Sequence, residues 1–454
     1  MPAHGNVLDM IGDTPMVELA HLDAGPCRLF AKLESQNPSG SIKDRIGLSM
    51  IEAAERDGKL EPGGLIVEAT AGNTGLGLAL VASQKDYRLI LVIPEKMSQE
   101  KVFHLKAFGA EVRMTRSDVT KGHPEYYQDY AERLARETGA FYINQFANPA
   151  NPLAHERTTG PEIWEQMGHD LDAVVCGVGT GGTITGVGRF LKRVAPRVEM
   201  VLADPEGSVL AGYVETGEIK EAGSWLVEGI GEDLVPPICE LSLVSRAITV
   251  SDAEAFAAAR ELLHKEGILA GSSSGTLLAA ALRYCRAQTE PKRVVTFVCD
   301  GGDKYLSKMY NEYWMIDQGF IRREAHGDLR DLISRRHVEH EDITVAPDDT
   351  LLTAYSRMKL YEVSQIPVVD DDHIVGIVDE SDIMLAVYDH EGRFGDPVHE
   401  SMSAKLETVA PSTPLAALLP IFDKGCVALV RDRDEYLGLI TRIDLLNHLR
   451  RRMR

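Results

Sequence analysis

The chain has 454 residues, of which 44% are hydrophobic and 26% charged, and its formal net charge is −21. This length is enough for about three domains, and the composition is that of a globular chain with ample core-forming residues. An acidic chain is poorly suited to bind nucleic acid or an anionic membrane surface, and no apolar run approaches the ~20 residues that a spanning helix needs.

The N-terminus and the cysteines predict a cytoplasmic protein. Residues 1–15 have neither the basic nor the apolar region of a secretion signal. His337 and His340 lack further Cys or His ligands at a suitable spacing, so no metal site is predicted. The cysteines form no C-x-x-C pair and are expected to be reduced thiols, at positions Cys27, Cys176, Cys239, Cys285, Cys299 and Cys426.

Between residues 28 and 310, short apolar runs alternate with amphipathic segments. Buried strands alternating with helices predict an α/β fold with parallel sheets, in which ligand loops lie at the carboxyl ends of strands. The runs are rich in β-branched residues and predict strands at 65–69, 89–94, 173–179, 199–204 and 294–300. Helices are expected between them, including 75–85, 101–108 and 253–266.

The stretch NPSGSIKDRIG at 37–47 places Lys43 at the start of an amphipathic helix, directly after a turn of small residues. The partial positive charge at a helix N-terminus disfavours an ammonium, and burial would lower the pKa of the amine further. A neutral amine is what Schiff-base chemistry requires. The alternative is an ordinary lysine on a solvated face, which is the commoner role.

Two glycine-rich loops follow predicted strands. TAGNTG at 70–75 places Asn73 at a strand-to-helix turn, where backbone N–H groups bind anions such as a carboxylate; a plain turn is the alternative. GVGTGGTITG at 177–186 has neither P-loop nor dinucleotide spacing. Its consecutive small residues before a helix predict a phosphate cradle formed by Gly179, Thr180, Gly181, Gly182 and Thr183.

A third loop, AGSSSG at 270–275, supplies hydroxyl groups, although a polar loop that caps a helix explains it equally well. A lysine for a Schiff base, a phosphate cradle, an asparagine and a serine together form the set of groups that pyridoxal phosphate needs.

These motifs resemble the fold-type II pyridoxal-phosphate enzymes of the cysteine synthase and cystathionine β-synthase group. The resemblance covers residues 6–320 and rests on IGDTP, NPSGSIKDR, TAGNTG, EKMSQEK, GTGGT and EGIG, which occur in the family's order. Each motif alone is weak evidence for the family, whereas their combination is specific to it. The resemblance implies a tryptophan synthase β-like catalytic part made of two α/β subdomains, with pyridoxal 5′-phosphate as cofactor.

The resemblance also implies roles for individual residues. Lys43 matches the catalytic lysine that holds the cofactor covalently, Asn73 the residue that hydrogen-bonds the cofactor's ring oxygen, and Ser273 the serine that faces the pyridine nitrogen. Gly179 to Thr183 match the phosphate loop. The resemblance implies that the substrate carboxylate is bound by Thr70, Ala71, Gly72, Thr74 and Gln145. It implies that the mouth of the pocket is formed by Gly229, Ile230 and Gly231.

Two departures from the family pattern matter. Ala71 stands where the family usually has serine, which removes a hydroxyl from the substrate loop and leaves the substrate preference open. The chain begins ten residues before IGDTP, so a heme-binding extension and a heme are not expected.

The last part of the chain contains an internal repeat. HIVGIVDESDIM (373–384) aligns with EYLGLITRIDLL (435–446), and VAPDDTLLTAYSRM (345–358) aligns with VAPSTPLAALLPIF (409–422). These units resemble a CBS domain pair of α+β type, called a Bateman module, and we expect them to bury their sheets against each other. The predicted domains are the catalytic domain at 1–320, a linker at 321–336, CBS domain 1 at 337–395 and CBS domain 2 at 396–454.

Thr441 and Asp444 match the nucleotide-binding pattern of CBS domains. In the first copy Asp382 matches the ribose-binding acid, but Asp379 replaces the threonine, and its carboxylate would repel a phosphate. We therefore predict a regulatory site near Thr441 and Asp444 for S-adenosylmethionine or an adenine nucleotide. A module that only dimerises is the alternative.

The resemblance of a catalytic part followed by such a pair implies a β-replacement in which L-homocysteine takes the place of the hydroxyl group of L-serine to give L-cystathionine. It also implies that hydrogen sulfide is released when L-cysteine is the donor. Two alternatives stay open. One is a cysteine synthase that uses O-acetylserine and sulfide, and the other is a regulatory protein that senses adenosyl nucleotides and has a vestigial catalytic part. A homodimer or higher homo-oligomer is expected, without nucleic acid or membrane partners.

Overall fold

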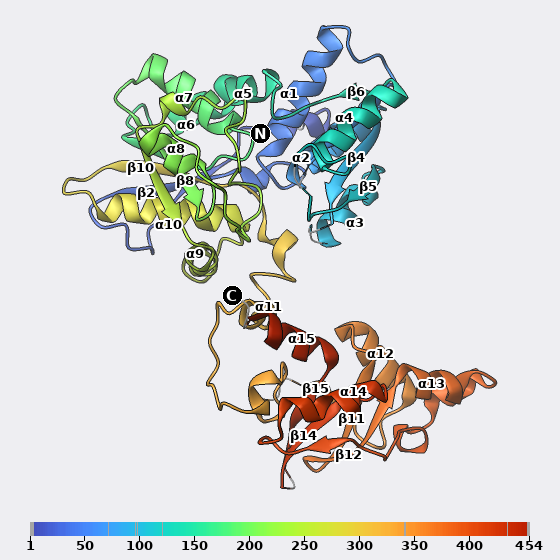
Figure 1. Ribbon diagram of the computed structural model, residues 1–454. Coiled ribbons are helices and arrows are strands. Elements are labelled where there is room, and N and C mark those ends of the chain that lie inside the picture. The colour runs from blue at the N-terminus through green and yellow to red at the C-terminus, as the bar shows by residue number, and fades with distance from the viewer. Residues whose placement is uncertain are drawn as a thin grey trace. The chain divides into compact units, whose positions relative to one another are not determined.

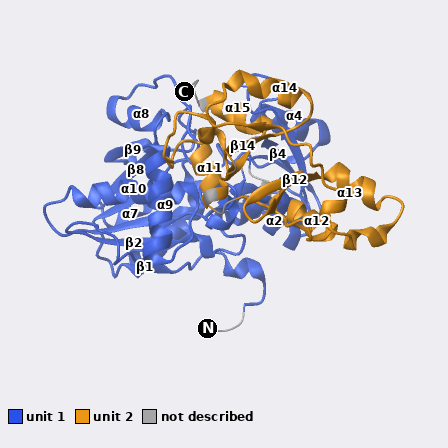
Figure 2. Ribbon diagram, turned by 90° about the horizontal axis from the view of Figure 1, so that it is seen from below, with its two compact units in different colours: residues 1–310 blue, residues 311–454 orange. Residues whose placement is uncertain are grey.

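The computed structural model describes residues 4–451 except 71, 96, 98, 120, 340, 341 and 434, and only the backbone at 99, 338 and 451. The chain divides into two compact units, residues 1–310 and 311–454 (Figure 2). Each unit has hydrophobic clusters of its own. None of the described helices is long and apolar enough to cross a membrane.

Unit 1 contains two largely parallel sheets flanked by helices (Figure 1). The six-stranded sheet has the order β1-β2-β10-β7-β8-β9, with only β1 antiparallel to its neighbour; its strands are β1 (Met16–Glu18), β2 (Arg28–Leu33), β7 (Ala173–Cys176), β8 (Glu199–Pro205), β9 (Arg246–Val250) and β10 (Arg293–Val298). The all-parallel four-stranded sheet has the order β5-β4-β3-β6, with strands β3 (Leu65–Ala69), β4 (Arg88–Pro94), β5 (Glu111–Thr115) and β6 (Phe141–Tyr142). The predicted α/β fold with two subdomains is confirmed.

Helices connect these strands and cover both faces of the sheets. They are α1 (Lys43–Arg56), α2 (Asn73–Gln84), α3 (Gln99–Ala107), α4 (Tyr127–Thr138), α5 (Ala150–Ala154), a π-helical turn η3 (His155–Thr159), α6 (Gly160–Gln166), α7 (Gly182–Val194), α8 (Leu210–Thr216), α9 (Asp252–Glu266) and α10 (Ser272–Arg286). Short 3₁₀ turns are η1 (Val7–Met10), η2 (Glu34–Gln36), η4 (Leu241–Leu243) and η5 (Gly302–Tyr305).

The two central strands of the smaller sheet, β3 and β4, are largely apolar because helices cover both of its faces. Ile66 and Leu91 point to the cluster that contains helices α1 and α2, whereas Val67 and Ile90 point to the cluster that contains α4. Neighbouring side chains of a strand point to opposite faces of the sheet, so each of these strands contributes side chains to both clusters.

Helices α1 and α2 approach each other backbone to backbone, because glycines lie at their contact. A Cβ on Gly77 would be 2.7 Å from the carbonyl oxygen of Lys43, and a Cβ on Gly47 would be 2.8 Å from the carbonyl carbon of Gly77. No side chain larger than hydrogen fits at either position without a backbone shift. The start of α1, which carries Lys43, is therefore held against α2, which begins at Asn73.

Unit 2 contains the two sequence repeats. The first has α12 (Leu351–Tyr361), the antiparallel pair β11 (Gln365–Asp370) and β12 (His373–Asp379), α13 (Glu380–Val387), and the turns η8 (Glu391–Gly395) and η9 (Val398–Glu400). The second has β13 (Thr408–Val409), η10 (Leu415–Leu418), α14 (Leu419–Asp423), β14 (Ala428–Asp432), β15 (Glu435–Ile440) and α15 (Arg442–Arg451). A cluster that includes Ile374 of one repeat and Leu429 and Tyr436 of the other joins their sheets, as predicted.

The segment predicted as a linker, 321–336, is partly built into this second unit. After α11 (Glu312–Asp317) it forms η6 (Leu329–Leu332), and a further turn η7 (His337–Glu339) follows. Leu329, Leu332 and Ile333 are buried in the core of the second repeat. The charged composition of the segment concealed these three apolar anchors, so the linker prediction was wrong for its last part.

We predict that Gly77→Ala destabilises the protein by about 1–3 kcal/mol, because the added methyl would press on the Lys43 carbonyl. The matched control is Gly212→Ala in α8, where a Cβ meets nothing within 4 Å. That change should be neutral or stabilise by up to about 1 kcal/mol. Denaturant unfolding of both variants is the measurement, and equal stabilities would contradict the tight α1–α2 contact.

Candidate active site

Lys43 is the first residue of α1 and is partly buried. The preceding turn is fixed by Gly40, which has φ +79°, and by Asp44, whose carboxylate accepts a hydrogen bond from the Ser39 backbone N–H at 2.7 Å. Burial lowers the pKa of the Lys43 amine, while the neighbouring Cys299, Asp300 and Glu232 act in the opposite direction. The amine is thus easier to deprotonate than an ordinary lysine, which is what a nucleophilic or basic amine requires.

The substrate loop predicted at 70–75 joins β3 to α2. Gly72 has φ +137°, and its N–H donates to Thr70 Oγ1 at 3.2 Å. Asn73 opens α2, and the hydroxyl of Thr74 donates to Gln145 Oε1 at 2.6 Å. The structure thus brings Gln145, distant in the sequence, to the substrate loop. Ala71 lies outside the described residues.

The loop predicted to bind phosphate joins β7 to α7, and its glycines are sterically required. A Cβ on Gly179 would be 2.5 Å from the Gly229 carbonyl oxygen, and one on Gly182 would overlap the Asn151 side chain. Gly181 has φ +86°, which favours glycine. The N–H groups at the start of a helix have no partner within it, so this loop and α7 form a suitable anion site.

Asn151 connects the substrate loop to the phosphate loop. Its Nδ2 donates to the backbone oxygen of Gln145 and to Thr180 Oγ1, both at 2.9 Å. Thr183 Oγ1 lies 3.3 Å from Nε2 of His155. Burial, with smaller contributions from Arg45 and Lys43, lowers the pKa of His155 well below its usual value, so the imidazole is neutral.

The remaining predicted residues lie at neighbouring loops. Ser273 is the second residue of α10 and is buried. Gly231 N–H donates to the Val178 oxygen at 2.8 Å, which places the 229–231 segment beside the strand end that leads into the phosphate loop. Within that segment Ile230 is buried and Gly229, with φ +86°, is exposed.

Sequence reasoning missed three polar residues of this region. Asp300 accepts a hydrogen bond from Asn73 Nδ2 at 2.8 Å, and Asn151 and His155 contact the phosphate loop as described above. Asp300 follows strand β10 at its carboxyl end, where ligand loops are expected, so this position could have been found. No pattern in the sequence distinguishes Asn151 or His155.

Unsatisfied polar atoms test whether the region fits pyridoxal phosphate. Asn73 Oδ1, Asn151 Oδ1 and Asp300 Oδ1 are buried and have no hydrogen-bond partner. Such atoms are rare in folded proteins and indicate a missing polar partner. These three oxygens accept hydrogen bonds, so they require donors from a bound molecule or water, whereas the glycine cradle of 179–183 suits a phosphate and the Lys43 amine suits a carbonyl carbon.

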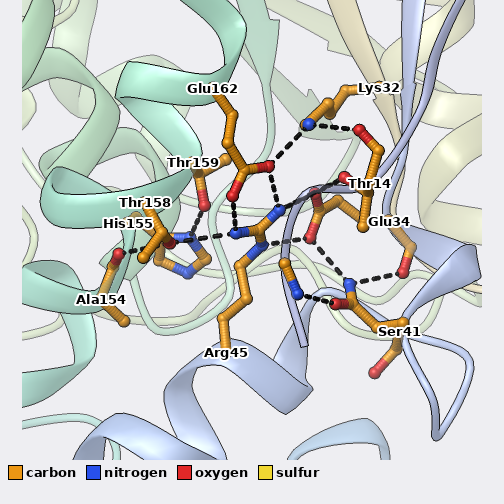
Figure 3. Close-up of polar contacts among 12 residues, drawn as sticks. Thr14, Lys32, Glu34, Ser41, Arg45, Ala154, His155, Thr158, Thr159 and Glu162 are labelled. Carbon is orange, nitrogen blue, oxygen red and sulfur yellow. Dashed lines mark hydrogen bonds and ion pairs between the residues drawn. The ribbon is translucent and has the colours of Figure 1, made fainter. Parts of the chain in front are cut away.

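A buried ion-pair cluster anchors α1 two residues after Lys43 (Figure 3). Arg45 contacts both oxygens of Glu34 at 2.7 and 2.8 Å and both oxygens of Glu162 at 2.6 and 2.7 Å, and Lys32 contacts Glu162 at 2.7 Å. Burial opposes ionisation of Glu162, but the hydrogen bonds and charges of Arg45 and Lys32 prevail and lower its pKa to about 2. Removing one partner from such a buried set is strongly destabilising.

The predicted regulatory residues lie in unit 2. Asp444 accepts hydrogen bonds from the Thr441 N–H at 2.7 Å, from the Thr441 hydroxyl at 2.5 Å and from the Ser334 hydroxyl. Thr441 and Asp444 line a cleft of about 690 Å³, to which the first repeat contributes Asp379. Asp382 instead pairs with Asp379 in a capping box at the start of α13, and it is not among the residues lining the cleft.

No group of three or more potential metal ligands occurs among the described residues.

The two-sheet α/β fold, the lysine at the start of α1 and the glycine cradle define a pyridoxal-phosphate enzyme of fold type II. The family described as pyridoxal-phosphate dependent enzyme matches residues 7–300, and CBS domains match 329–389 and 398–451. The chain therefore belongs to the pyridoxal-phosphate-dependent enzymes, with a CBS domain pair at its C-terminal end.

Three relatives illustrate the range of the family. A cystathionine beta-synthase of Dictyostelium discoideum is 36% identical over 98% of this chain and 92% of its own length. A cysteine synthase of Staphylococcus aureus is 44% identical over 66% of this chain and 95% of its own length. A crystal structure of a hydrogen sulfide-producing enzyme from Fusobacterium nucleatum superposes with a TM-score of 0.63 and 35% identity, covering 67% of this chain and all of that one.

Glu68 gives the substrate region a pH-dependent element. Its carboxyl is fully buried on β3 and accepts hydrogen bonds from the backbone N–H groups of Asn144 at 2.8 Å and Gln145 at 3.3 Å. Burial raises its pKa to about 8, against the effect of these hydrogen bonds. The folded protein therefore keeps a proton that the unfolded chain loses near the usual pKa, so stability falls as the pH rises from about 4.5 through about 8.

We predict that Glu68→Gln reduces the loss of stability at high pH, because an amide does not ionise. Between pH 5 and pH 9 the melting temperature of the variant should fall by roughly 5 °C less than that of the parent. Glu137→Gln, whose carboxylate is 64% exposed on α4, is the matched control and should follow the parent. Thermal denaturation across pH is the measurement, and parallel curves for parent and Glu68→Gln would contradict the prediction.

Proposed function

We propose that this enzyme condenses L-serine with L-homocysteine to L-cystathionine by β-replacement, and that it releases hydrogen sulfide when L-cysteine is the donor. The observation that carries the proposal is the convergence of the Lys43 amine, the substrate loop and the glycine cradle in one region. Similarity to cystathionine beta-synthases extends over nearly the whole chain, including the CBS pair, and this supports the choice of reaction.

Pyridoxal phosphate, when bound, withdraws electrons from the α-carbon of the amino acid that it holds. Lys43 would hold the cofactor, Gly179 to Thr183 its phosphate, and Asn73 and Ser273 its ring. Lys43 Nζ, whose pKa burial lowers, then takes the α-proton and returns a proton to the departing hydroxyl oxygen.

The substrate carboxylate is assigned to the loop at the start of α2. Thr70 can donate its hydroxyl proton there, and the Gly72 N–H holds that hydroxyl in place. The Thr74 hydroxyl donates to Gln145, whose Nε2 donates to the Ala69 oxygen at 3.0 Å. The segment 229–231 borders the entrance for the thiol. A cysteine synthase that uses O-acetylserine and sulfide is the second candidate, because the Staphylococcus aureus relative matches the catalytic part alone at higher identity.

We predict that the purified protein forms cystathionine from L-serine and L-homocysteine, and that Lys43→Ala lowers this activity at least ~10³-fold because it removes both the cofactor link and the proton carrier. Lys59→Ala, an exposed lysine paired with Asp57, is the matched control and should keep full activity. Product formation measured by chromatography provides the test.

Turnover with O-acetylserine and sulfide but not with homocysteine would replace the proposed reaction by cysteine synthesis. Absence of both activities in a protein that binds adenosyl ligands would favour the regulatory alternative. The cytoplasmic location, the absence of heme and the homo-oligomeric state stay predictions from the sequence.

We further infer that the cleft beside Thr441 binds S-adenosylmethionine rather than a phosphorylated nucleotide. Two basic residues, Arg335 and Arg442, line it. The acidic lining residues outnumber them and are Asp342, Glu362, Asp379, Glu380 and Asp444. Excess negative charge repels phosphate groups and attracts a sulfonium and an ammonium.

We predict that S-adenosylmethionine raises the melting temperature of the full chain more than ATP or AMP does, since a ligand that binds the folded state stabilises it. Asp444→Asn should weaken this binding at least ~10-fold, because it removes a charged hydrogen-bond acceptor. Asp371→Asn, in the exposed turn between β11 and β12, is the control. Isothermal titration calorimetry gives the affinities. Preference for ATP would contradict the charge argument, and binding of neither ligand would leave dimerisation as the module's role.

A further inference from the structure

Asp300 lies where the turns before two helices of the active site meet. It follows β10, and its side chain is fully buried. Its backbone forms a bridge with Ser41, two residues before Lys43, and its carbonyl accepts a hydrogen bond at 3.1 Å from the N–H of Gly271, two residues before Ser273. The backbone thus holds Asp300 against the starts of both α1 and α10.

The side chain of Asp300 reaches a third helix. Its Oδ2 accepts hydrogen bonds from Asn73 Nδ2 at 2.8 Å, at the start of α2, and from the Tyr305 hydroxyl at 2.7 Å. Gly271 leaves the space for the other oxygen, since a Cβ there would overlap Oδ1. A carboxylate only accepts hydrogen bonds, so Asn73 must turn its NH₂ group toward Asp300.

The orientation of this amide has a consequence for the ligand. One N–H of Asn73 points to Asp300, and the second N–H of the same group is available for another acceptor. Without Asp300, the amide could rotate and present its oxygen instead, which would repel an oxygen on a cofactor ring.

The ionisation states of the groups around Asp300 and Lys43 show which of them place a charge near the Lys43 amine. Burial raises the pKa of Cys299 to about 12 and that of Tyr305 well above its usual value, so both are neutral near pH 7. Asp300 and Glu232 are thus the acidic groups that act on the Lys43 amine. The other titratable groups that interact with Lys43 or Asp300 are His155, Lys304 and Tyr310.

We propose that Asp300 is a positioning residue of the active site, which orients the Asn73 amide toward the cofactor ring and supplies the counter-charge of the Lys43 nitrogen. This inference rests on the proposed cofactor site, and it is independent of which amino acid the enzyme converts.

The test follows the visible absorption of the bound cofactor as a function of pH, in the full chain and without any amino acid substrate. Asp300→Asn keeps the size of the side chain and removes its charge. Loss of a negative charge beside Lys43 should lower the pH at which the band titrates by at least ~1 unit. The dissociation constant for pyridoxal phosphate should rise roughly tenfold, because a neutral amide can present either its oxygen or its NH₂ group and no longer fixes the orientation of Asn73.

Three further variants make the outcome decisive. Tyr305→Phe keeps both the charge and the Asn73 contact, so its band should titrate within about 0.5 unit of the parent. Asp303→Asn neutralises an exposed acid three residues away and should match the parent as well. Asp300→Ser, which also lacks the charge, should reproduce the shift if Asp300→Asn folds poorly.

An unchanged titration in a folded Asp300 variant would overturn the counter-charge role, and an unchanged dissociation constant for pyridoxal phosphate would overturn the orienting role. Unfolding of both Asp300 variants, checked by circular dichroism, would overturn the whole proposal and assign Asp300 a purely structural role. A parent that binds the cofactor and titrates as expected, yet makes no cystathionine, would contradict the proposed reaction and leave the role of Asp300 supported.

Discussion

The backbone contact between α1 and α2 sets the geometry on which the active site depends. Gly47 and Gly77 allow the Lys43 carbonyl to lie against α2, so the start of α1 is positioned by main-chain packing instead of by flexible side chains. Asn73 opens that same α2 and reaches Asp300, which is pinned to the turn before α1. The lysine, the asparagine and the acid therefore form a closed set of contacts in which a shift of one helix would displace the others.

Two sets of buried polar groups lie near Lys43 in the fold, and they differ in how fully their hydrogen bonds are satisfied. Arg45 uses both carboxylates of Glu34 and Glu162, and this saturated cluster holds α1 in place. Asp300 and Asn73 each keep one buried oxygen without a partner. A structural cluster has its hydrogen bonds satisfied, whereas unpaired buried acceptors raise the free energy of the folded protein until a hydrogen-bond donor contacts them. The satisfied Arg45 cluster therefore belongs to the scaffold of α1, and the unsatisfied Asp300 and Asn73 belong to the candidate active site.

The sequence predicted the strands β3, β4, β7, β8 and β10, because both faces of these strands are buried and their residues are largely apolar, as in 65–69. It placed the start of α2 two residues late, because the helix begins directly after Gly72, whose positive φ closes the turn. Asn151 and His155 could not be found, since their roles come from tertiary contacts between distant segments. The same reason explains the error at 321–336, where only three spaced apolar residues enter the core of the second repeat.

The two CBS repeats show why a motif match alone is weak evidence for a ligand. In each copy, two residues three positions apart hydrogen-bond each other at the start of a helix. They are Asp379 and Asp382 in the first copy, and Thr441 and Asp444 in the second. This arrangement caps a helix whether or not a ligand is present. What distinguishes the copies is position and charge, because Asp444 lines the cleft and Asp382 does not. A ligand that entered beside Thr441 would meet Asp379 of the other repeat, so the acid that stands in place of the threonine in the first copy would help to select that ligand.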